Sequence, residues 1–206
     1  MEGLWSVVNS VISSKTYILG DEYDKKFWLV DCGDIDNVFG RLNEVSKGDY
    51  VIEGVLLTHA HYDHIYGIPR LTERFHNVKI YTNENGKAVL ANERLNLSRY
   101  HRDPINYISD NVVVCNEGET IDLFDGVSAL VYYTPGHHPS CLTYLIGDSI
   151  FTGDSYIPGS DVVTKLPGGN RNDALVSLAR IKKLAENRII FPGHVEGVKS
   201  SLFGLI

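Results

Sequence analysis

The segment Thr58–His64 contains four residues of types that commonly bind metal ions, within six consecutive positions: His59, His61, Asp63 and His64. His59 and His61 are two residues apart, and an extended chain sends alternate side chains to the same side, so both imidazoles can face one metal. A turn into a helix at Asp63 would bring Asp63 and His64 to a second point nearby. Imidazole and carboxylate together suit zinc, and also iron or manganese. A polar loop with incidental histidines is the alternative, and this density of ligand types disfavours it.

The remaining histidines and the cysteines add to this picture. Five of the eight histidines lie in three short motifs flanked by glycine or by a strand. His76 and His101 stand outside any motif, and we expect them to be solvated. Cys32, Cys115 and Cys141 form neither a CxxC pair nor an even set. Buried free thiols are therefore favoured over a disulfide framework.

Short strands in both halves of the chain must position these residues. The predicted strands cover residues 4–12, 16–19, 27–30, 51–58, 79–81, 112–115, 127–134, 142–146, 149–152 and 188–191. The predicted helices cover residues 34–45, 63–75, 86–95 and 173–186. Gly67 and Pro69 are expected to kink or interrupt the second helix. The segment 99–110 is polar and receives no assignment.

The last predicted helix has the strongest apolar stripe, formed by Leu175, Leu178, Ile181 and Leu184, with Asn172 or Asp173 as its cap. In each half, strands are followed by helices that need a sheet face to cover. The economical arrangement is an α+β, four-layer αββα sandwich, with two sheets back to back and helices outside.

Further motifs continue the pattern of residues 59–64, which matches the HxHxDH motif of the metallo-β-lactamase fold superfamily. The chain resembles this superfamily from about residue 16 to residue 197. Three segments resemble, in order, its third ligand loop, its strand-terminal bridging aspartate and its final ligand histidine: Tyr133–His137, Phe151–Asp154 and Phe191–His194. Val30–Gly33 resembles an early family motif whose aspartate, here Asp31, supports the metal site from behind. A single metallo-β-lactamase-like domain over residues 1–206 is expected.

The resemblance implies a dinuclear site with one shared carboxylate. One metal would be held by His59, His61 and His137, and a second by Asp63, His64 and His194, with Asp154 between them. Two divalent cations about 3.5–4 Å apart repel each other, and a shared carboxylate with a bridging hydroxide offsets that repulsion. The net positive charge lowers the pKa of the bound water toward about 7. Asp63 or Asp154 would orient the attacking water.

Within the superfamily, the chain most resembles glyoxalase II-like (hydroxyacylglutathione hydrolase-like) enzymes, through residues 81–83, 166–170 and 174–178. The expected function is hydrolysis of a small thioester or ester with two zinc ions. Two departures limit the resemblance. Only twelve residues follow His194, so we expect no carboxy-terminal helical domain of the kind that binds glutathione in longer relatives. Residues 159–162 read Gly-Ser-Asp-Val where many relatives have Gly-Arg-x-Asp.

Other functions use the same residues. A mononuclear non-haem iron sulfur oxygenase, resembling the persulfide dioxygenases, would use His59, His137 and Asp154. A lactone or phosphodiester hydrolase would use the whole ligand set. A catalytically silent metal scaffold would bind metal but leave no open coordination position.

Five residues near the motifs are weaker candidates. Tyr66 and Tyr156 follow ligand motifs, and either phenol could donate a hydrogen bond to a developing oxyanion, although ordinary packing is favoured. His138 follows a ligand loop and is expected at the surface, with a contact to the site as the alternative. Lys165 and Arg171 flank the glycine-rich loop and could meet an anionic substrate, although simple exposure is favoured.

Composition limits the class of partner. The 206 residues carry 19 basic and 26 acidic side chains, a formal net charge of −7. This sign disfavours nucleic acid or an anionic membrane as the main partner. No apolar run approaches the roughly 20 residues of a spanning helix, and the amino terminus does not resemble a secretion signal. We therefore expect a soluble, cytoplasmic protein that acts on a small molecule.

Overall fold

The computed structural model describes residues 3–21 and 23–196, so the expected domain of residues 1–206 extends past the described part at both ends. The first sheet contains β1 (Gly3–Val8), β2 (Lys15–Asp21), β3 (Lys26–Val30), β4 (Val51–Leu56), β5 (Lys79–Thr82) and β6 (Val112–Val114). The second contains β7 (Thr120–Phe124), β8 (Val127–Tyr133), β9 (Leu142–Ile146), β10 (Ser149–Gly153) and β11 (Ile189–Pro192). The helices are α1 (Ile35–Ser46), α2 (Tyr62–Ile65), α3 (Ile68–Arg74), α4 (Glu84–Leu90), the 3-10 helix η1 (Ser98–Tyr100) and α5 (Arg171–Leu184).

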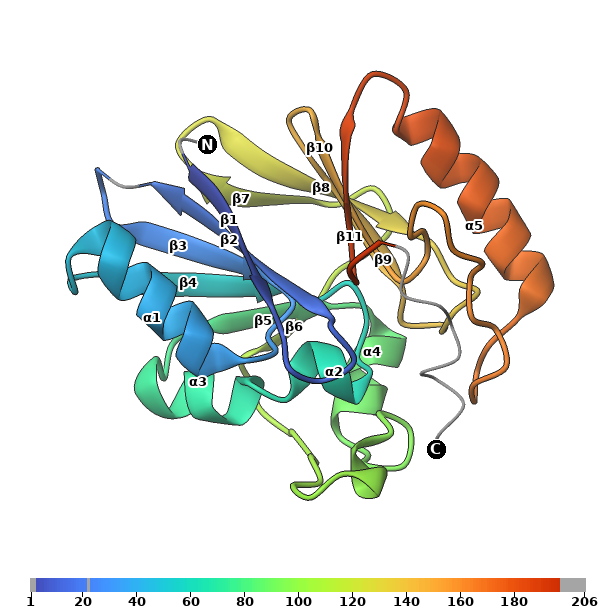
Figure 1. Ribbon diagram of the computed structural model, residues 1–206, viewed down its shortest axis with the longest axis horizontal. Coiled ribbons are helices and arrows are strands. Elements are labelled where there is room, and N and C mark those ends of the chain that lie inside the picture. Colours follow the sequence, from blue (N-terminus) through green and yellow to red (C-terminus); the bar gives the residue numbers. More distant parts are fainter. Residues whose placement is uncertain (1–2, 22, 197–206) are drawn as a thin grey trace.

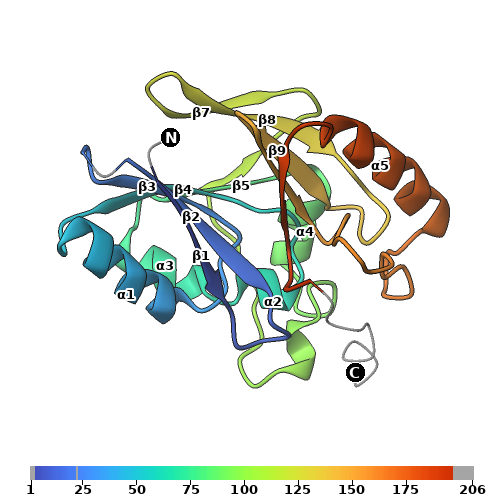
Figure 2. The ribbon, with the colours of Figure 1, turned by 45° about the horizontal axis from the view of Figure 1, so that its top comes forward.

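The two sheets lie face to face with helices on their outer sides, as the sequence predicts (Figure 1). The first sheet has the strand order β1-β2-β3-β4-β5-β6, and the second has the order β11-β10-β9-β8-β7. α1 and α3 lie beside the first sheet, whereas α5 lies beside the second (Figure 2). The α+β sandwich is therefore confirmed.

Alternation along the strands produces two apolar cores. In β3, Phe27 and Leu29 pack in one core with Leu42 of α1, so this core lies between the first sheet and its helices. Trp28 and Val30 of β3 belong to the other core, which includes residues from β7, β8, β9 and β10. Because successive side chains of a strand point to opposite faces, one strand can serve both cores. The second core therefore lies between the sheets.

Two predicted elements differ from the structure. The helix expected over residues 63–75 is divided into α2 and α3, because Gly67 forms the N-cap of α3 and Pro69 occupies its first turn. The structure also contains β7, which pairs antiparallel with β8 and was not predicted. The helix expected over residues 86–95 is α4, which ends at Leu90, and the unassigned segment 99–110 contains only the end of η1 as regular structure.

The buried face of α5 also differs from the predicted one. Within the predicted stripe, Ile181 is buried and Leu178 and Leu184 are partly buried, but Leu175 is exposed; Ala174 and Ser177 are buried instead. An added Cβ at Gly136 would lie 2.3 Å from the Ala174 Cα, and Ser177 Oγ donates a hydrogen bond to the Pro135 carbonyl. The helix therefore approaches the loop after β8 so closely that small residues must face inward. The cap is Asn170, whose side chain accepts hydrogen bonds from the main chain at residues 172 and 173.

Candidate metal centre

The segment after β4 adopts the two conformations that its ligand spacing requires. His61 has extended backbone angles (φ −73°, ψ 153°) and directly precedes α2. Asp63 and His64 then leave the chain from the first helical turn. The main chain therefore changes direction between the two pairs of ligand-type residues, as the sequence predicts.

Three other strand ends bring further ligand-type residues to the same place. His137 follows β8, Asp154 follows β10 and His194 follows β11. Gly153 has a φ of +50°, and an added Cβ there would lie 2.5 Å from the Thr58 Cβ. Glycine is required at this position because it accepts the left-handed conformation and leaves room for the close approach.

His59, His61 and His137 form one group, which we call the imidazole half. Their ring centroids lie 4.8 Å apart for His59 and His61, 5.0 Å for His59 and His137, and 4.8 Å for His61 and His137. All three side chains are buried. Each offers a nitrogen within 4.8 Å of the others, a spacing that could hold one metal ion.

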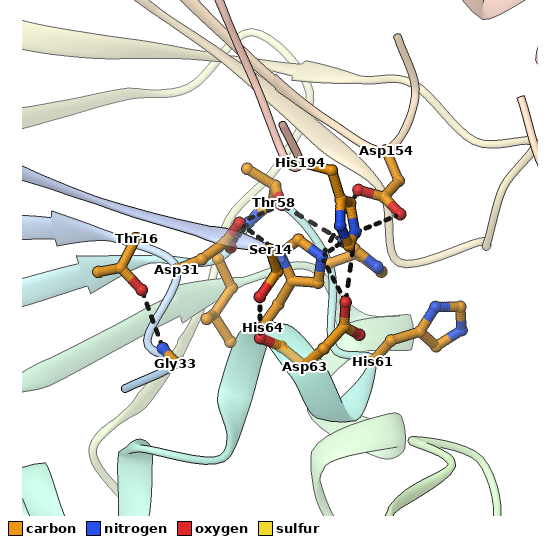
Figure 3. A network of polar contacts seen from close by, with 12 residues as sticks. Ser14, Thr16, Asp31, Gly33, Thr58, His61, Asp63, His64, Asp154 and His194 are labelled. Atoms are coloured by element: carbon orange, nitrogen blue, oxygen red, sulfur yellow. Dashed lines mark hydrogen bonds and ion pairs between the residues drawn. The ribbon is translucent and has the colours of Figure 1, made fainter. Parts of the chain in front are cut away.

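Asp63, His64 and His194 form a second group, which we call the acidic half. Asp63 Oδ2 lies 3.2 Å from His194 Nε2 and 3.3 Å from His64 Nε2. Figure 3 shows these side chains converging with Asp154, while the His61 ring points to the other side. Asp154 Oδ2 lies 3.3 Å from His194 Nε2 and 3.6 Å from His137 Nε2, so this carboxylate reaches one residue of each half.

Asp31 lies behind the acidic half, where the resemblance to the superfamily implies it. Its Oδ2 is 2.8 Å from His64 Nδ1 and accepts a hydrogen bond from Thr58 Oγ1 at 2.7 Å. The Thr58 main-chain N–H donates to its Oδ1, also at 2.7 Å (Figure 3). This carboxylate therefore fixes the orientation of the His64 ring, as outer carboxylates do at metal sites.

Two main-chain carbonyls fix the other rings. His137 Nδ1 donates to the Val163 carbonyl at 2.8 Å, and His194 Nδ1 donates to the Ile12 carbonyl at 3.0 Å. A carbonyl oxygen only accepts, so Nδ1 carries the proton in each ring. In the neutral ring, the unprotonated Nε2 then faces the cluster, which is the arrangement metal-binding imidazoles use.

The two halves differ in charge. Burial lowers the pKa of His59 and His61 well below its usual value, and the neighbouring imidazoles lower it further. Burial also opposes charge on His64 and His194, but the carboxylates around them outweigh it. The pKa of His64 therefore lies well above its usual value, and that of His194 rises to about 10. His59 and His61 are therefore neutral, whereas His64 and His194 share protons with carboxylates.

The donor atoms themselves fit a metal. His59 Nε2 and His61 Nε2 are buried and have no hydrogen-bond partner among the described residues. A buried polar atom without a partner costs free energy, so such atoms call for an explanation. Neutral imidazole nitrogens beside carboxylate oxygens are the donor set preferred by zinc and also used by iron and manganese. The residues present therefore fit divalent metal ions.

A small cavity of about 20 Å³ adjoins the cluster, bordered by His61, Asp63, His137 and Asp154. His101 also borders it, half-buried and stacked on Tyr62 with ring centroids 3.9 Å apart, a contact that the sequence did not predict. A lone histidine outside a motif carries no signal of such a long-range contact.

His138 was wrongly expected at the surface. It is buried, with its ring centroid 5.0 Å from that of His61. The Ser140 main-chain N–H donates to His138 Nδ1, so the proton of the neutral ring is on Nε2. The double histidine after the glycine of the ligand loop was the available signal for this contact.

The two tyrosines that could serve an oxyanion are not part of the cluster. The Tyr66 phenol donates to Asp34 Oδ1, and the residue borders a separate cavity with Asp34 and Arg70. Tyr156 is half-buried, does not border the cavity beside the cluster, and accepts a hydrogen bond at its carbonyl from Thr152 Oγ1.

Lys165 and Arg171 are exposed, as expected. Both border a cavity of about 410 Å³ between the glycine-rich loop and α5, together with Leu175 and Leu178. The cavity adjoining the metal cluster does not include them.

Comparisons with known proteins agree with this geometry. A protein of Bacillus velezensis named probable polyketide biosynthesis zinc-dependent hydrolase BaeB is 28% identical over 189 residues, covering 91% of this chain and 75% of that protein. A hydroxyacylglutathione hydrolase of Xylella fastidiosa is 30% identical over 160 residues, covering 78% of this chain and 53% of the relative. The chain thus spans about half the length of that enzyme.

Structural similarity is also extensive. The crystal structure of the BLEG-1 B3 metallo-beta-lactamase superposes with a TM-score of 0.81 at 26% identity, covering 94% of this chain and 92% of that one. In the part of the chain that the structure describes, no helix has the length and apolar character needed to cross a membrane. The family model of the metallo-beta-lactamase superfamily matches residues 13–194. The chain therefore belongs to the metallo-beta-lactamase superfamily.

Proposed function

We propose that this protein is a dinuclear metal-dependent hydrolase, with two zinc ions, that acts on a small thioester or ester. The observation that carries the proposal is the convergence of seven buried ligand-type side chains from four strand ends, two of which have an unpartnered imidazole nitrogen. A structural polar network would leave no such atoms unsatisfied.

In this proposal, the imidazole half holds one cation and the acidic half holds the other. Asp154 lies between them, and it also groups with His59 and His64, one residue from each half. When bound, two divalent ions polarise a carbonyl and activate water at neutral pH. The contacts of Asp154 with both halves support its role as the shared ligand.

The chain's own residues prepare the site for that chemistry. Asp31 and the carbonyls of Ile12 and Val163 hold three rings with Nε2 toward the centre. Asp154 Oδ1 is buried without a hydrogen-bond partner among the described residues, so it is available to orient an attacking water. No side-chain nucleophile is needed, because bound metal ions would supply an activated water. Ser14 and Ser155 donate to main-chain carbonyls, Ser140 Oγ lies 2.8 Å from His138 Nδ1, and the three cysteines are buried thiols.

The names of the relatives support a small thioester or ester as the substrate. They are hydroxyacylglutathione hydrolase and zinc-dependent hydrolase. The cavity of about 20 Å³ beside the cluster is bordered by His61, Asp63, His137 and Asp154, and it has room for about one water molecule. Glutathione as the thiol part is not included in the proposal.

The proposal is tested by metal analysis and turnover on the same preparation. Purified protein should hold about two equivalents of metal, chelation should abolish thioester hydrolysis, and zinc should restore it. His59→Ala should lose metal and activity, whereas His76→Ala, at an exposed histidine, should lose neither. Full turnover after exhaustive metal removal would overturn the proposal. One equivalent of iron with oxygen uptake would favour the sulfur oxygenase instead, and a screen of lactones and phosphodiesters would identify those substrates.

A further inference from the structure

The cavity beside the metal cluster has a wall that contributes no metal ligand. Ile12, Leu97 and Leu166 border it from three separate segments, and Tyr62 and His101 complete it. The three aliphatic side chains offer no hydrogen bond. Ligand pockets commonly combine such apolar surface with a few polar groups that fix orientation. The imidazole of His101 is suited to that role in this wall.

Two of the aliphatic residues are held in a costly backbone conformation. Ile12 has a φ of +54° and Leu97 has a φ of +67°. Residues other than glycine rarely adopt the left-handed backbone conformation, least of all a β-branched residue such as Ile12. At Ile12 the conformation belongs to the turn between β1 and β2, in which Ile12 and Ser13 both have positive φ and the Ser14 main-chain N–H donates to the Val11 carbonyl. At Leu97 the surrounding structure enforces it, so the fold holds this residue in the wall.

The segment that carries Leu97 and His101 is fixed by buried polar contacts. Asn96, which is fully buried, donates from Nδ2 to the carbonyls of Val89 and Ile105 at 3.2 and 2.9 Å. Its own carbonyl accepts a hydrogen bond from the Tyr62 main-chain N–H at 2.8 Å. The segment is thus tied directly to α2, which supplies two of the metal-site residues.

The His101 ring is oriented but not hydrogen-bonded. It lies flat on the Tyr62 ring, with an interplanar angle of 20°. Among residues 3–21 and 23–196, none forms a hydrogen bond with the ring nitrogens of His101. The residue is only partly buried and borders the cavity. Stacking fixes the plane of the ring and leaves its polar edge available.

We infer that His101 is a substrate-contacting residue, which binds an oxygen of the substrate other than the one at the reacting carbonyl. This inference rests on the proposed hydrolase function and adds to it. The acyl group would lie against this wall and would carry a hydroxyl or carbonyl group that reaches His101. The stacked ring would select acyl groups with such an oxygen over purely aliphatic ones, which leave its polar edge unpaired.

Binding of the product carboxylates tests the contact without requiring turnover. Calorimetry on zinc-loaded protein would compare lactate with propionate, and 3-hydroxybutanoate with butanoate, pairs that differ chiefly by one hydroxyl group. Wild-type protein should bind the hydroxylated member of at least one pair about tenfold more tightly. His101→Phe keeps an aromatic ring for stacking on Tyr62 but removes the nitrogens, so it should remove this preference. His76→Ala should keep it.

Metal content and melting temperature of His101→Phe should equal those of the wild type, which separates a substrate contact from a structural role. In turnover assays, kcat/KM should fall about tenfold for the matching hydroxyacyl thioester and remain unchanged for its aliphatic counterpart. A wild-type protein with no preference in either pair would overturn the inference, as would a preference that survives in His101→Phe. Failure of the hydrolase proposal would appear separately, as absence of metal-dependent turnover while the binding preference persists.

Discussion

The two halves of the metal centre solve the same problem of burial in different ways. In the acidic half, His64 and His194 lie beside carboxylates, and their pKa values are raised although burial opposes the charge. In the imidazole half, His59 and His61 are kept neutral by burial and by neighbouring imidazoles, and one nitrogen in each ring has no hydrogen-bond partner within residues 3–21 and 23–196. The buried polar groups of the acidic half are paired through shared protons, whereas the imidazole half keeps unpaired nitrogens among the described residues.

The two halves are therefore expected to respond differently to a metal ion. A cation entering the acidic half replaces protons on His64 and His194, so its binding there is coupled to proton release. A cation that binds His59 and His61 meets neutral nitrogens and releases no proton from these two rings. Asp154 contacts both halves, so it couples two sites with opposite behaviour.

The largest expected effect on metal content and turnover comes from changing Asp154, the residue that both halves share. Asp154→Asn keeps the shape of the side chain but removes its charge, so the second metal should be lost and turnover should fall on the order of 10³-fold. Metal analysis and kcat/KM measure the two effects. Asp148→Asn, at an exposed aspartate in the turn before β10, should change neither. Near-normal turnover with two bound metals in Asp154→Asn would contradict the bridging assignment.

A smaller effect should separate the halves. Asp31 touches His64 but no residue of the imidazole half, so Asp31→Asn should weaken metal binding in the acidic half by about 10–100-fold. Asp31 has a φ of +61°, which asparagine tolerates well, so the backbone is not strained by the change. Metal titration should show one weakened and one unchanged site. Equal weakening of both would contradict independent halves, and Asp36→Asn, at an exposed aspartate, is the matched control.

The ligand motifs were predictable because each is short and lies where a strand ends. The two-residue spacing of His59 and His61 specifies one direction, and the helical turn at Asp63 specifies another, so local geometry determines both. The sandwich was predictable for a similar reason, since alternating apolar residues identify most strands. β7 was missed because only five residues, flanked by polar turns, carry its alternation.

The cavity wall was not predictable, because its contacts join distant segments. His101 meets Tyr62 only after the segment between α4 and β6 folds back, held by the buried Asn96. Likewise, the inward face of α5 follows from the approach of Gly136 rather than from the leucine spacing. Where tertiary contacts decide which residue is buried, periodicity along one element is not sufficient.

The two halves should also give the metal-free protein opposite dependences of the unfolding free energy on pH. In the unfolded chain, a histidine has a pKa of about 6.5. Below this pH, His59 and His61 bind protons in the unfolded chain but not in the folded one, so the free energy of unfolding decreases as the pH falls. Above 6.5, the unfolded chain loses protons that His64 and His194 retain, so their contribution is lost as pH rises, up to about 10 for His194. Stability should therefore be greatest near pH 6.5.

Denaturant unfolding between pH 5 and 8.5, in the presence of chelator, would measure this profile. Each fully titrating histidine contributes about 1.4 kcal/mol per pH unit. His59→Ala should flatten the acid limb, and His194→Ala should flatten the alkaline limb. A profile that rises continuously through this range would show that the two halves do not differ in charge.

The smallest expected effect concerns Tyr66, which lies outside both halves although its position after the ligand motif made it a candidate. Its phenol donates to Asp34, and burial together with that hydrogen bond raises its pKa, so the hydroxyl serves as a neutral donor within the fold. Tyr66→Phe should cost about 1 kcal/mol of unfolding free energy and leave kcat/KM within about twofold of wild type. A tenfold loss of kcat/KM at unchanged metal content would instead place this phenol at the reacting atoms. Tyr66 would then belong to the site together with the two halves.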